Sequence, residues 1–360
     1  MVNKKILMFY INAIHEGGAE RVIIQLAHHF AQVGYRSILI TSFVDANEYV
    51  VPPDVERISM EQTQIKQSKW KRNFNRIKML RKLCEKYQPL ALISFMAEAN
   101  CRAVLATVGT PVKTIVSVRN DPKREYAGKL GYFVGKCIIP LADGCVFQTK
   151  KAQQWFPQKI QKKSVVIFND VDKVFFETEY KGGKDIVTLG RLSLQKNQSV
   201  LIEAFAKIAN SYPDNNLLIY GVGVLEKELK ALVLRLHLEK RVIFKGLTRN
   251  AASVLSSARM FVLSSDYEGM PNALMEALAI GVPSISTDCP CGGPQILIEN
   301  GVNGLLVPVN DKEKLASALS LLLCDHNLSQ KLSVNARKKS QLYRTERVFA
   351  EWKEYIEKII

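Results

Sequence analysis

Residues 260–281 read MFVLSSDYEGMPNALMEALAIG, and this stretch decides the fold class. Four apolar residues from Met260 to Leu263 predict a buried strand, and a polar turn follows them. A helix then starts near Pro271 and ends near Gly281, since proline is favoured in the first turn and glycine just after the last. A strand, a turn and a helix in this order predict a parallel α/β sheet, in which ligands bind beyond the carboxyl ends of the strands.

Two carboxylates belong to this stretch, Glu268 in the turn and Glu276 in the helix. Glu276 would contact either a sugar hydroxyl or only water. Taken alone, two carboxylates at this spacing are usually part of a solvated helix face and a cap.

The same alternation of short apolar runs and helical segments extends along the whole 360-residue chain. It predicts an α/β protein of two doubly wound Rossmann-like domains that face each other across a cleft, with the ligand site in that cleft. The predicted domains are residues 1–168 and 185–342, with a polar, turn-rich linker at 169–184 and a last helix at 343–360. The predicted strands are residues 6–11, 37–41, 90–95, 114–118, 145–147 and 165–168 in the first half and 186–189, 217–220, 242–244, 260–263, 284–286 and 305–307 in the second.

The composition is that of a globular protein, with 47% hydrophobic and 23% charged residues. No run is long and apolar enough for a spanning helix, and the first residues are too polar for a signal peptide, so we expect a cytoplasmic protein. Seven cysteines, an odd number without a CxxC pair, indicate reduced thiols rather than disulfides or a zinc site.

The net charge of +16 is concentrated in the first half of the chain. Residues 1–165 contain 26 lysines and arginines against 12 aspartates and glutamates, whereas residues 166–360 contain 24 against 22. A surface of this sign attracts nucleic acid, anionic lipid headgroups or phosphorylated small molecules, and the total alone does not choose among them.

Residues 65–87 hold nine basic residues against one acidic residue, with apolar residues at helical spacing. This pattern predicts a basic amphipathic helix of the kind that lies on an anionic membrane with its aromatic residues at the headgroups. The alternative is a helix whose apolar stripe belongs to the domain core and whose lysines are only solvated. The residues expected at the membrane surface are Lys69, Trp70, Lys71, Arg72, Phe74, Arg76 and Lys78.

Three further segments follow predicted strands. Gly17 and Gly18 open a helix and can either hold an anion or let the helix pack closely, while His15 before them is either a proton-handling group or an ordinary loop residue. Arg191 and Lys196, in the segment GRLSLQKN, can neutralise a diphosphate or belong to a solvated basic loop.

The third segment, residues 117–122, reads SVRNDP after a predicted strand. Arg119 and Asp121 there are either acceptor contacts or a surface ion pair in a turn.

These motifs, together with GVNGLLVP at residues 301–308, resemble those of the retaining GT-B glycosyltransferases of family four, also called group 1 glycosyltransferases. Their order and spacing are similar across nearly the whole chain, and the glutamate pair with its glycine and proline is the most specific of them. The resemblance implies a metal-independent enzyme without a cofactor, whose last helix returns to the first domain.

The resemblance also implies roles for individual residues. It places Glu268 at the donor sugar, Glu276 at the ribose hydroxyls, and Arg191 with Lys196 at the diphosphate, so that Glu268, Arg191 and Lys196 are the expected catalytic residues. The other expected donor-site residues are Gly17, Gly18, Gly246, Gly269, Met270 and Pro271.

The chain departs from the family pattern at two places. No histidine follows the strand at residues 90–95, and Glu98 or Asn100 is expected to substitute for it in the acceptor site, together with His15, Arg119 and Asp121. Gln295 stands where similar chains often have glutamate. Cys289 and Cys291 beside it are expected to be packing residues, and Asp170 and Asp172 to be part of the linker turn rather than a metal-binding pair.

The expected function is transfer of a hexose or N-acetylhexosamine from a nucleotide diphosphate sugar, with UDP as the expected nucleotide. The expected acceptor is a glycan on a polyprenyl diphosphate lipid, in surface polysaccharide synthesis such as O-antigen or capsule, at the inner face of the cell membrane. The alternatives are a nucleotide-sugar 2-epimerase, for which the basic helix has no purpose, and a nucleic-acid-binding protein. The sequence disfavours the latter because the charge is confined to one domain and no aromatic-basic recognition motif occurs.

Overall fold

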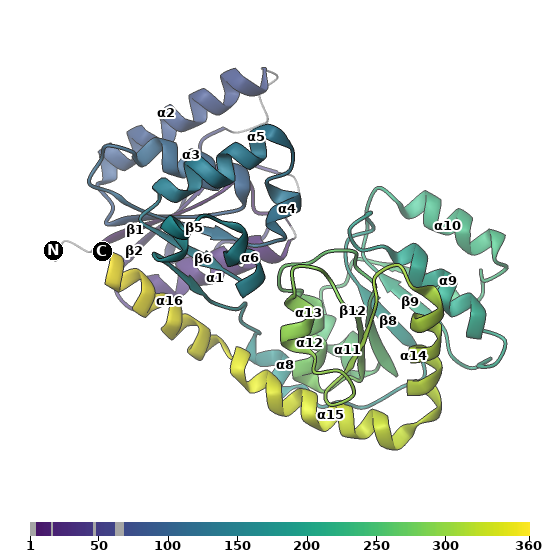
Figure 1. Cartoon of the computed structure of the whole chain (residues 1–360). Coiled ribbons are helices and arrows are strands. Elements are labelled where there is room, and N and C mark those ends of the chain that lie inside the picture. Colours follow the sequence, from purple (N-terminus) through teal and green to yellow (C-terminus); the bar gives the residue numbers. More distant parts are fainter. Residues whose placement is uncertain (1–4, 16, 46–47, 62–67) are drawn as a thin grey trace. The chain divides into compact units, whose positions relative to one another are not determined.

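The computed structural model describes residues 5–15, 17–45, 48–61 and 68–360 (Figure 1). The chain divides into two compact units, Met1–Asn169 with Glu346–Ile360, and Asp170–Thr345. The first division therefore falls next to residue 168, where the sequence predicts the end of the first domain. The segment predicted as a linker belongs to the second unit from Asp170 onward and contains the short helix α8 (Lys173–Glu177).

The first unit is built on a parallel sheet of the order β3-β2-β1-β4-β5-β6-β7. The chain fills one side of β1 and then crosses to the other side with β4, which is the doubly wound arrangement. The strands are β1 (Ile6–Ile11), β2 (Arg36–Thr41), β3 (Val55–Ser59), β4 (Ala91–Phe95), β5 (Lys113–Val118), β6 (Gly144–Phe147) and β7 (Ser164–Val166).

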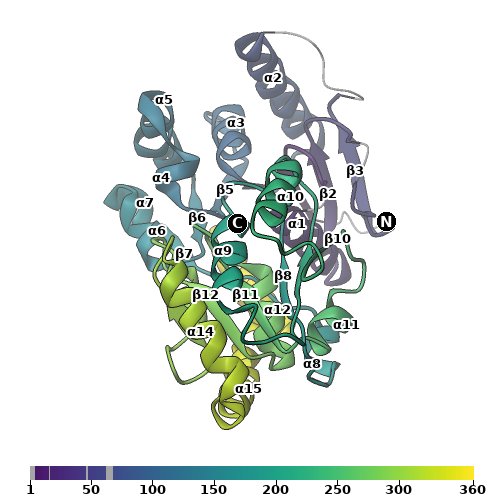
Figure 2. The ribbon, with the colours of Figure 1, turned by 90° about the vertical axis from the view of Figure 1, so that its right-hand side faces the viewer.

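Helices cover both faces of this sheet because neighbouring strand residues point to opposite sides. Met8 packs with residues of α2 (Lys69–Tyr87) and α3 (Ala97–Thr107), and Phe9 packs with residues of α1 (Gly18–Gln32) and α16 (Thr345–Ile359). Figures 1 and 2 both show α3 between α2 and α5. The remaining elements are α4 (Pro122–Glu125), α5 (Gly128–Phe133), the π-helix η1 (Val134–Ile138), the 3₁₀ helix η2 (Ile139–Leu141), α6 (Lys150–Trp155) and α7 (Gln158–Gln161).

The C-terminal helix α16 is part of the first unit's core. Its Trp352 is buried and stacks on Phe95 of β4, with ring centroids 5.7 Å apart. The backbone N–H of Cys145 in β6 donates a hydrogen bond to the Tyr355 hydroxyl over 2.8 Å. Gly144 permits this approach, since a Cβ there would lie 2.6 Å from the same hydroxyl.

The second unit is a parallel sheet of the order β10-β9-β8-β11-β12-β13. Its strands are β8 (Ile186–Leu189), β9 (Leu217–Tyr220), β10 (Val242–Gly246), β11 (Met260–Leu263), β12 (Ser284–Thr287) and β13 (Leu305–Val307). Its helices, after α8, are α9 (Gln198–Ile208), α10 (Glu226–Arg235), α11 (Ala251–Ser256), α12 (Asn272–Ile280), α13 (Gly293–Leu297), α14 (Lys312–Cys324), α15 (His326–Ser340) and the 3₁₀ helix η3 (Gln341–Tyr343).

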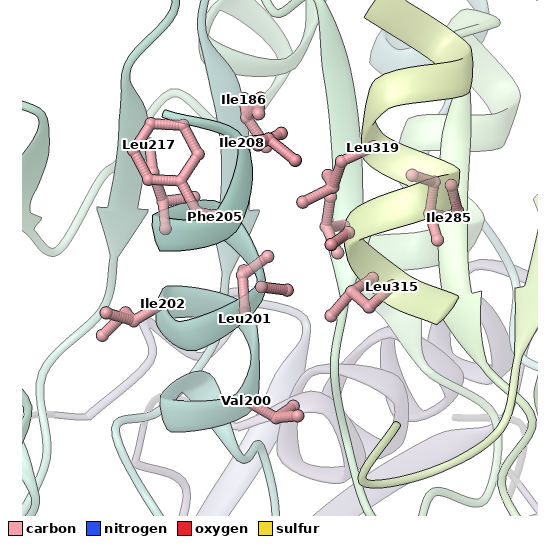
Figure 3. Packing of buried hydrophobic residues seen from close by; sticks show 14 of the residues in the cluster. Ile186, Val200, Leu201, Ile202, Phe205, Ile208, Leu217, Ile285, Leu315 and Leu319 are labelled. Carbon is pink, nitrogen blue, oxygen red and sulfur yellow. The ribbon is translucent and has the colours of Figure 1, made fainter. Parts of the chain in front are cut away.

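The core on one face of this sheet is packed by α9 and α14. Figure 3 shows Leu201 of α9 on the side toward Leu315 and Leu319 of α14, and Phe205 beside Leu217 of β9; these side chains are fully or almost fully buried. A buried side chain of this size contributes roughly 1.5–3 kcal/mol to stability, so this cluster holds the helices on the sheet.

Each unit is thus a Rossmann-like α/β domain, and the twelve predicted strands are confirmed with shifts of one or two residues at some ends. The sequence analysis missed β3, which reads VERIS and buries only Val55. It lies at the sheet edge and pairs only with β2, so it needs few apolar residues. Within the described residues, no helix is both long enough and apolar enough to cross a membrane.

Candidate functional site

The second unit has its topological switch point between β8 and β11, where the chain reverses the direction in which it adds strands. The loop after β8 runs through residues 190–197, and the loop after β11 runs through residues 264–271. Ligands of doubly wound sheets bind where two such loops diverge. The motifs that contain Arg191, Lys196 and Glu268 therefore meet at this sheet edge.

An ion pair joins the two loops. The Lys196 Nζ donates a hydrogen bond to Glu268 Oε1 over 2.6 Å. The same oxygen accepts a hydrogen bond from Ser265 Oγ over 2.7 Å, and the other accepts one from Gln195 Nε2 over 3.3 Å. The Glu268 carboxylate is buried but has three donors, which offsets the cost of removing its charge from water.

Backbone contacts hold the two loops in register. The N–H of Asp266 donates to the carbonyl oxygen of Gln195 over 2.9 Å, and Ser264 Oγ donates to the carbonyl oxygen of Lys196, also over 2.9 Å. Asn197 Nδ2 donates to Asp266 Oδ1 over 2.7 Å, from a residue with the left-handed φ of 44°. These bonds fix the position of the ion pair before any ligand arrives.

The turn at residues 269–271 packs against the start of α13. A Cβ on Gly293 would lie 1.7 Å from the Gly269 carbonyl oxygen, so only glycine fits there. Met270 is buried, and Pro271 is the N-cap residue of α12. The first N–H groups of a helix have no partner within the helix and favour an anion, so this turn presents backbone donors beside Glu268.

Glu276 and Arg191 have contrasting environments. Glu276 is buried in α12 among apolar residues such as Met275 and Ala277, where a carboxylate is rare unless it is paired. Arg191 is exposed, and its guanidinium has no hydrogen-bond or ion-pair partner in the part of the chain that the structure describes. The second unit thus offers an available cation near an ion pair, which suits an anionic ligand.

Cys289 packs beneath this site. Its Sγ donates to the carbonyl oxygen of Ser265 over 3.2 Å, and burial together with the nearby Glu268 carboxylate raises the pKa of the thiol to about 12. Cys289 and Cys291 are both buried, as predicted for packing residues. Gln295 Nε2 donates to Asp288 Oδ2 over 2.8 Å. Among the described residues, no three histidine, cysteine, aspartate or glutamate side chains gather to hold a metal ion.

The predicted linker carboxylates make local contacts. Asp172 Oδ1 accepts a hydrogen bond from the N–H of Val174 over 2.9 Å and caps α8. Asp170 Oδ2 accepts one from Thr345 Oγ1 over 2.9 Å. Gly246, the remaining predicted nucleotide contact, ends β10 at a φ of 67°, and the pairing of β10 with β9 shifts its register between Phe244 and Gly246.

In the first unit, the residues predicted after β1 lie at the start of α1. Gly17 is its N-cap residue, and Gly18 is its first residue. The His15 ring lies 3.4 Å from an Asp45 carboxylate oxygen and 3.9 Å from one of Glu20. His15 is therefore surrounded by carboxylates on a partly exposed loop.

The residues predicted after β4 have different environments, and one prediction was wrong. Asn100 is fully buried, accepts a hydrogen bond from Ser94 Oγ and donates one to the carbonyl oxygen of Ser117, both over 2.8 Å. It joins β4 to β5 and is not available to an acceptor. Glu98 is about half exposed and lies 3.7 Å from the Arg102 guanidinium.

Arg119 and Asp121, predicted after β5, are both buried. The Arg119 guanidinium donates to Asn169 Oδ1 and lies 4.6 Å from the centre of the Phe95 ring. Asp121 Oδ1 accepts from the N–H of Lys123 over 3.0 Å and caps α4. The two side chains thus support the carboxyl edge of the sheet rather than lying on the surface.

The structure of α2 agrees in part with each of the two interpretations of the basic segment. Its C-terminal half buries Leu80 and Cys84 in the core, whereas Trp70 and Phe74 in its first turns are 75% and 57% exposed, with Lys78 Nζ 4.8 Å from the centre of the Phe74 ring. The exposed residues of the predicted membrane surface are Trp70, Lys71, Phe74 and Lys78, and Arg72 is partly buried. The predicted residues 65–67 lie outside the described residues, and so does the side chain of Lys69.

Arg76 does not belong to that surface, so its prediction was wrong. Its side chain is buried and donates two hydrogen bonds of 2.8 Å to the Glu61 carboxylate. It also lies 5.5 Å from the centre of the Phe43 ring. A paired, buried guanidinium cannot reach a lipid headgroup.

The sequence analysis missed two polar residues at the first unit's switch point, which lies between β1 and β4. Arg102 in α3 is buried and donates to Asn12, just after β1, and to Asn73 of α2. Asn12 could have been found from its position directly after a strand. Arg102 could not, because nothing in the sequence distinguishes it from a solvated helical arginine.

With this geometry established, comparison with known proteins identifies the family. A sequence model of the group 1 glycosyl transferases matches residues 170–339, which is nearly the whole second unit. N-acetyl-alpha-D-glucosaminyl L-malate synthase of Bacillus anthracis is 30% identical over 277 residues, covering 73% of this chain and 71% of that protein. The chain belongs to the group 1 glycosyltransferases and is a glycosyltransferase.

One relative matches over nearly the whole of both chains. GalNAc-alpha-(1->4)-GalNAc-alpha-(1->3)-diNAcBac-PP-undecaprenol alpha-1,4-N-acetyl-D-galactosaminyltransferase of Campylobacter jejuni is 25% identical over 359 residues, covering 98% of each chain.

Solved structures share the fold. Sucrose-phosphate synthase of Thermosynechococcus elongatus superimposes with a TM-score of 0.85 at 20% identity, covering 99% of each chain. HepE of Anabaena, solved in complex with UDP and glucose, gives a TM-score of 0.81 at 18% identity, covering 99% of this chain and all of that one. These neighbours are GT-B glycosyltransferases, which agrees with the two Rossmann-like units described above.

Proposed function

We propose that this glycosyltransferase moves a hexose or N-acetylhexosamine from a nucleotide diphosphate sugar and retains the configuration at its anomeric carbon. The observation that carries the proposal is the Lys196–Glu268 ion pair at the switch point of the second unit. It sets a cation and a hydrogen-bond acceptor side by side, with the exposed Arg191 in the same loop as Lys196. A diphosphate needs the cations, and a sugar ring needs the acceptor.

In this proposal the protein acts mainly through fixed charge. The bond between the anomeric carbon and the diphosphate oxygen breaks, and the acceptor hydroxyl forms the new bond on the same face while its proton passes to the departing diphosphate. Arg191 and Lys196 stabilise the negative charge on the leaving group without a metal ion, and Glu268 orients the sugar and its developing positive charge. Glu276 holds the ribose, and UDP is the expected nucleotide because HepE, which shares the fold, was solved with UDP.

A lipid-linked glycan is the proposed acceptor. The name of the Campylobacter jejuni relative describes an acceptor glycan on PP-undecaprenol, and this chain matches 98% of that protein. The excess positive charge of residues 1–165 suits both a diphosphate-linked acceptor and an anionic membrane. We therefore place the reaction at the inner face of the cell membrane, in the synthesis of a surface glycan.

The exposed start of α2 is the proposed membrane contact. Trp70 and Phe74 would lie at the level of the headgroups, with Lys71 and Lys78 facing the lipid phosphates. Replacing both Trp70 and Phe74 by serine should lower binding to phosphatidylglycerol vesicles severalfold, whereas the same change at the exposed Val334 of the second unit should not. Equal vesicle binding by all these variants would contradict this contact.

The proposed reaction is tested by product analysis. The purified chain is incubated with UDP-linked and GDP-linked hexoses and N-acetylhexosamines, with and without polyprenyl-diphosphate-linked glycans, in the presence of EDTA. We expect transfer that needs the acceptor, survives EDTA and keeps the donor's anomeric configuration in the product. An inverted product or a requirement for metal would contradict the proposed mechanism, and an isomerised sugar formed without any acceptor would identify an epimerase.

A further inference from the structure

The carboxyl group of Glu125 has an unusual environment in the first unit. Glu125 is the last residue of α4, which directly follows the carboxyl end of β5. Both of its carboxyl oxygens are buried, and within residues 5–15, 17–45, 48–61 and 68–360 neither has a hydrogen-bond partner. Buried polar groups are nearly always paired, so an unpaired carboxyl group needs an explanation.

The charges that act on this carboxyl group come from its own segment. The Arg119 guanidinium favours its ionised form, and Asp121 disfavours it. Burial has the largest effect, and the net result of burial and these two charges is that the pKa of Glu125 is raised to about 8. The neighbouring Tyr126 hydroxyl, whose pKa burial also raises, is neutral, and Lys150 and Lys151 of the adjacent α6 are exposed. At neutral pH the group is therefore largely a neutral acid, which can donate one hydrogen bond and accept others.

Glu125 lies just beyond the end of β5, where a ligand is expected, and hydrogen bonds hold the residues of that strand end. Asn100 joins β4 to β5, and Arg119 is fixed by Asn169 and by the Phe95 ring. Ligands of doubly wound sheets bind beyond the carboxyl ends of the strands, and α4 begins there. A fold that needed this carboxyl group only for stability would pair it, as it pairs Glu61 with Arg76 by two hydrogen bonds of 2.8 Å.

We propose that the Glu125 carboxyl group binds the acceptor glycan, exchanging hydrogen bonds with a sugar hydroxyl. A carboxylic acid and a hydroxyl can each donate and accept, so the two groups satisfy each other. This inference rests on the proposed glycosyl transfer and adds to it a residue that contacts the acceptor. The unpaired state in the free protein follows, because the partner arrives with the substrate.

The experiment compares Glu125→Gln and Glu125→Leu with Glu85→Leu, a matched change at an exposed glutamate of the same unit. The rate of transfer is measured at saturating donor while the acceptor varies, and the probes are short polyprenyl-diphosphate-linked N-acetylhexosamine mono-, di- and trisaccharides. Thermal unfolding of each variant and release of nucleotide without acceptor are measured alongside.

We expect Glu125→Leu to lower kcat/KM for the acceptor by about tenfold or more, because the hydrogen bonds are lost, and to leave acceptor-independent nucleotide release unchanged. It should also unfold at a temperature equal to or above that of the wild type, since it removes a buried unpaired carboxyl group. Glu125→Gln keeps a donor and an acceptor, so it should retain most of the activity and lack the decline in acceptor affinity that the wild type has above about pH 8.

A lower unfolding temperature for both Glu125 variants, or an unchanged kcat/KM for the acceptor in Glu125→Leu, would overturn the proposal and make Glu125 a structural residue. The stability measurement needs no acceptor, so it decides on Glu125 even if the wild type transfers to none of the probes. Failure of the wild type to transfer to any of the probes would refute the proposed acceptor class instead.

Discussion

Breaking the Lys196–Glu268 ion pair should destabilise the second unit. The side chains are 21% and 8% exposed, and the atoms are 2.6 Å apart. Removing one partner of a buried ion pair costs about 3–5 kcal/mol when the remaining charge has no other partner. In Lys196→Met, Glu268 keeps its hydrogen bonds from Ser265 and Gln195, so we expect a loss of about 2–3 kcal/mol.

A double-mutant cycle isolates the interaction between the two residues. Lys196→Met, Glu268→Gln and the double variant should give a coupling free energy of about 1.5–3 kcal/mol. The exposed pair Lys207–Glu313, at 2.7 Å in the same unit, is the matched control and should couple by less than about 0.5 kcal/mol.

The three tryptophans, Trp70, Trp155 and Trp352, all belong to the first unit. Tryptophan fluorescence therefore reports unfolding of the first unit and not of the second, which contains the ion pair. Urea unfolding should therefore be recorded by far-UV circular dichroism, with fluorescence as an internal control that stays unchanged. Additive effects of the two substitutions would refute the conclusion that this pair holds the two loops together.

Three further outcomes are expected. Gly293→Ala should weaken nucleotide binding at least tenfold, because the new Cβ would lie 1.7 Å from the Gly269 carbonyl oxygen and would displace that carbonyl group. Unchanged affinity in a calorimetric titration would contradict this. Arg76→Ala should lower the free energy of unfolding of the first unit by about 3–5 kcal/mol, as followed by tryptophan fluorescence, while Lys71→Ala should have almost no effect. For Glu125 the folded pKa of about 8 lies above the ordinary value of 4.5, so the native state binds more protons between these values. The advantage in stability of Glu125→Gln over the wild type should therefore grow as pH rises from about 4.5 to 8, by at most about 1.4 kcal/mol per pH unit, and a constant difference would contradict the burial of this group.

The fold could be predicted because parallel strands buried on both faces are short apolar runs, which a sequence displays directly. The edge strand β3 could not, since only Val55 of its residues is buried. The loops that form the candidate site could be predicted from the sequence, because polar residues directly after strands gather at one sheet edge. Its key contact was not predictable, because Lys196 and Glu268 meet only through the adjacency of β8 and β11.

The two wrong predictions have a common cause. Arg76 was assigned to a membrane surface from helical spacing, and Asn100 to the acceptor site as a substitute for a histidine of the family pattern, but each has a buried partner that lies well away in the sequence. Arg76 pairs with Glu61, and Asn100 bonds the Ser117 carbonyl oxygen of the next strand. Local patterns tell which residues are polar, whereas only the tertiary structure tells which of them are already paired.

The central claim is that the switch point of the second unit binds a nucleotide diphosphate through Arg191 and Glu276. The most direct measurement is a calorimetric titration of the whole chain with UDP and with GDP in the presence of EDTA. It should include Arg191→Ala, Glu276→Ala and, as a control, Arg235→Ala at the exposed end of α10. We predict saturable binding of one nucleotide that survives EDTA, is lost in the first two variants and is kept in the third. Absence of binding to both nucleotides, or equal binding by all three variants, would contradict the account.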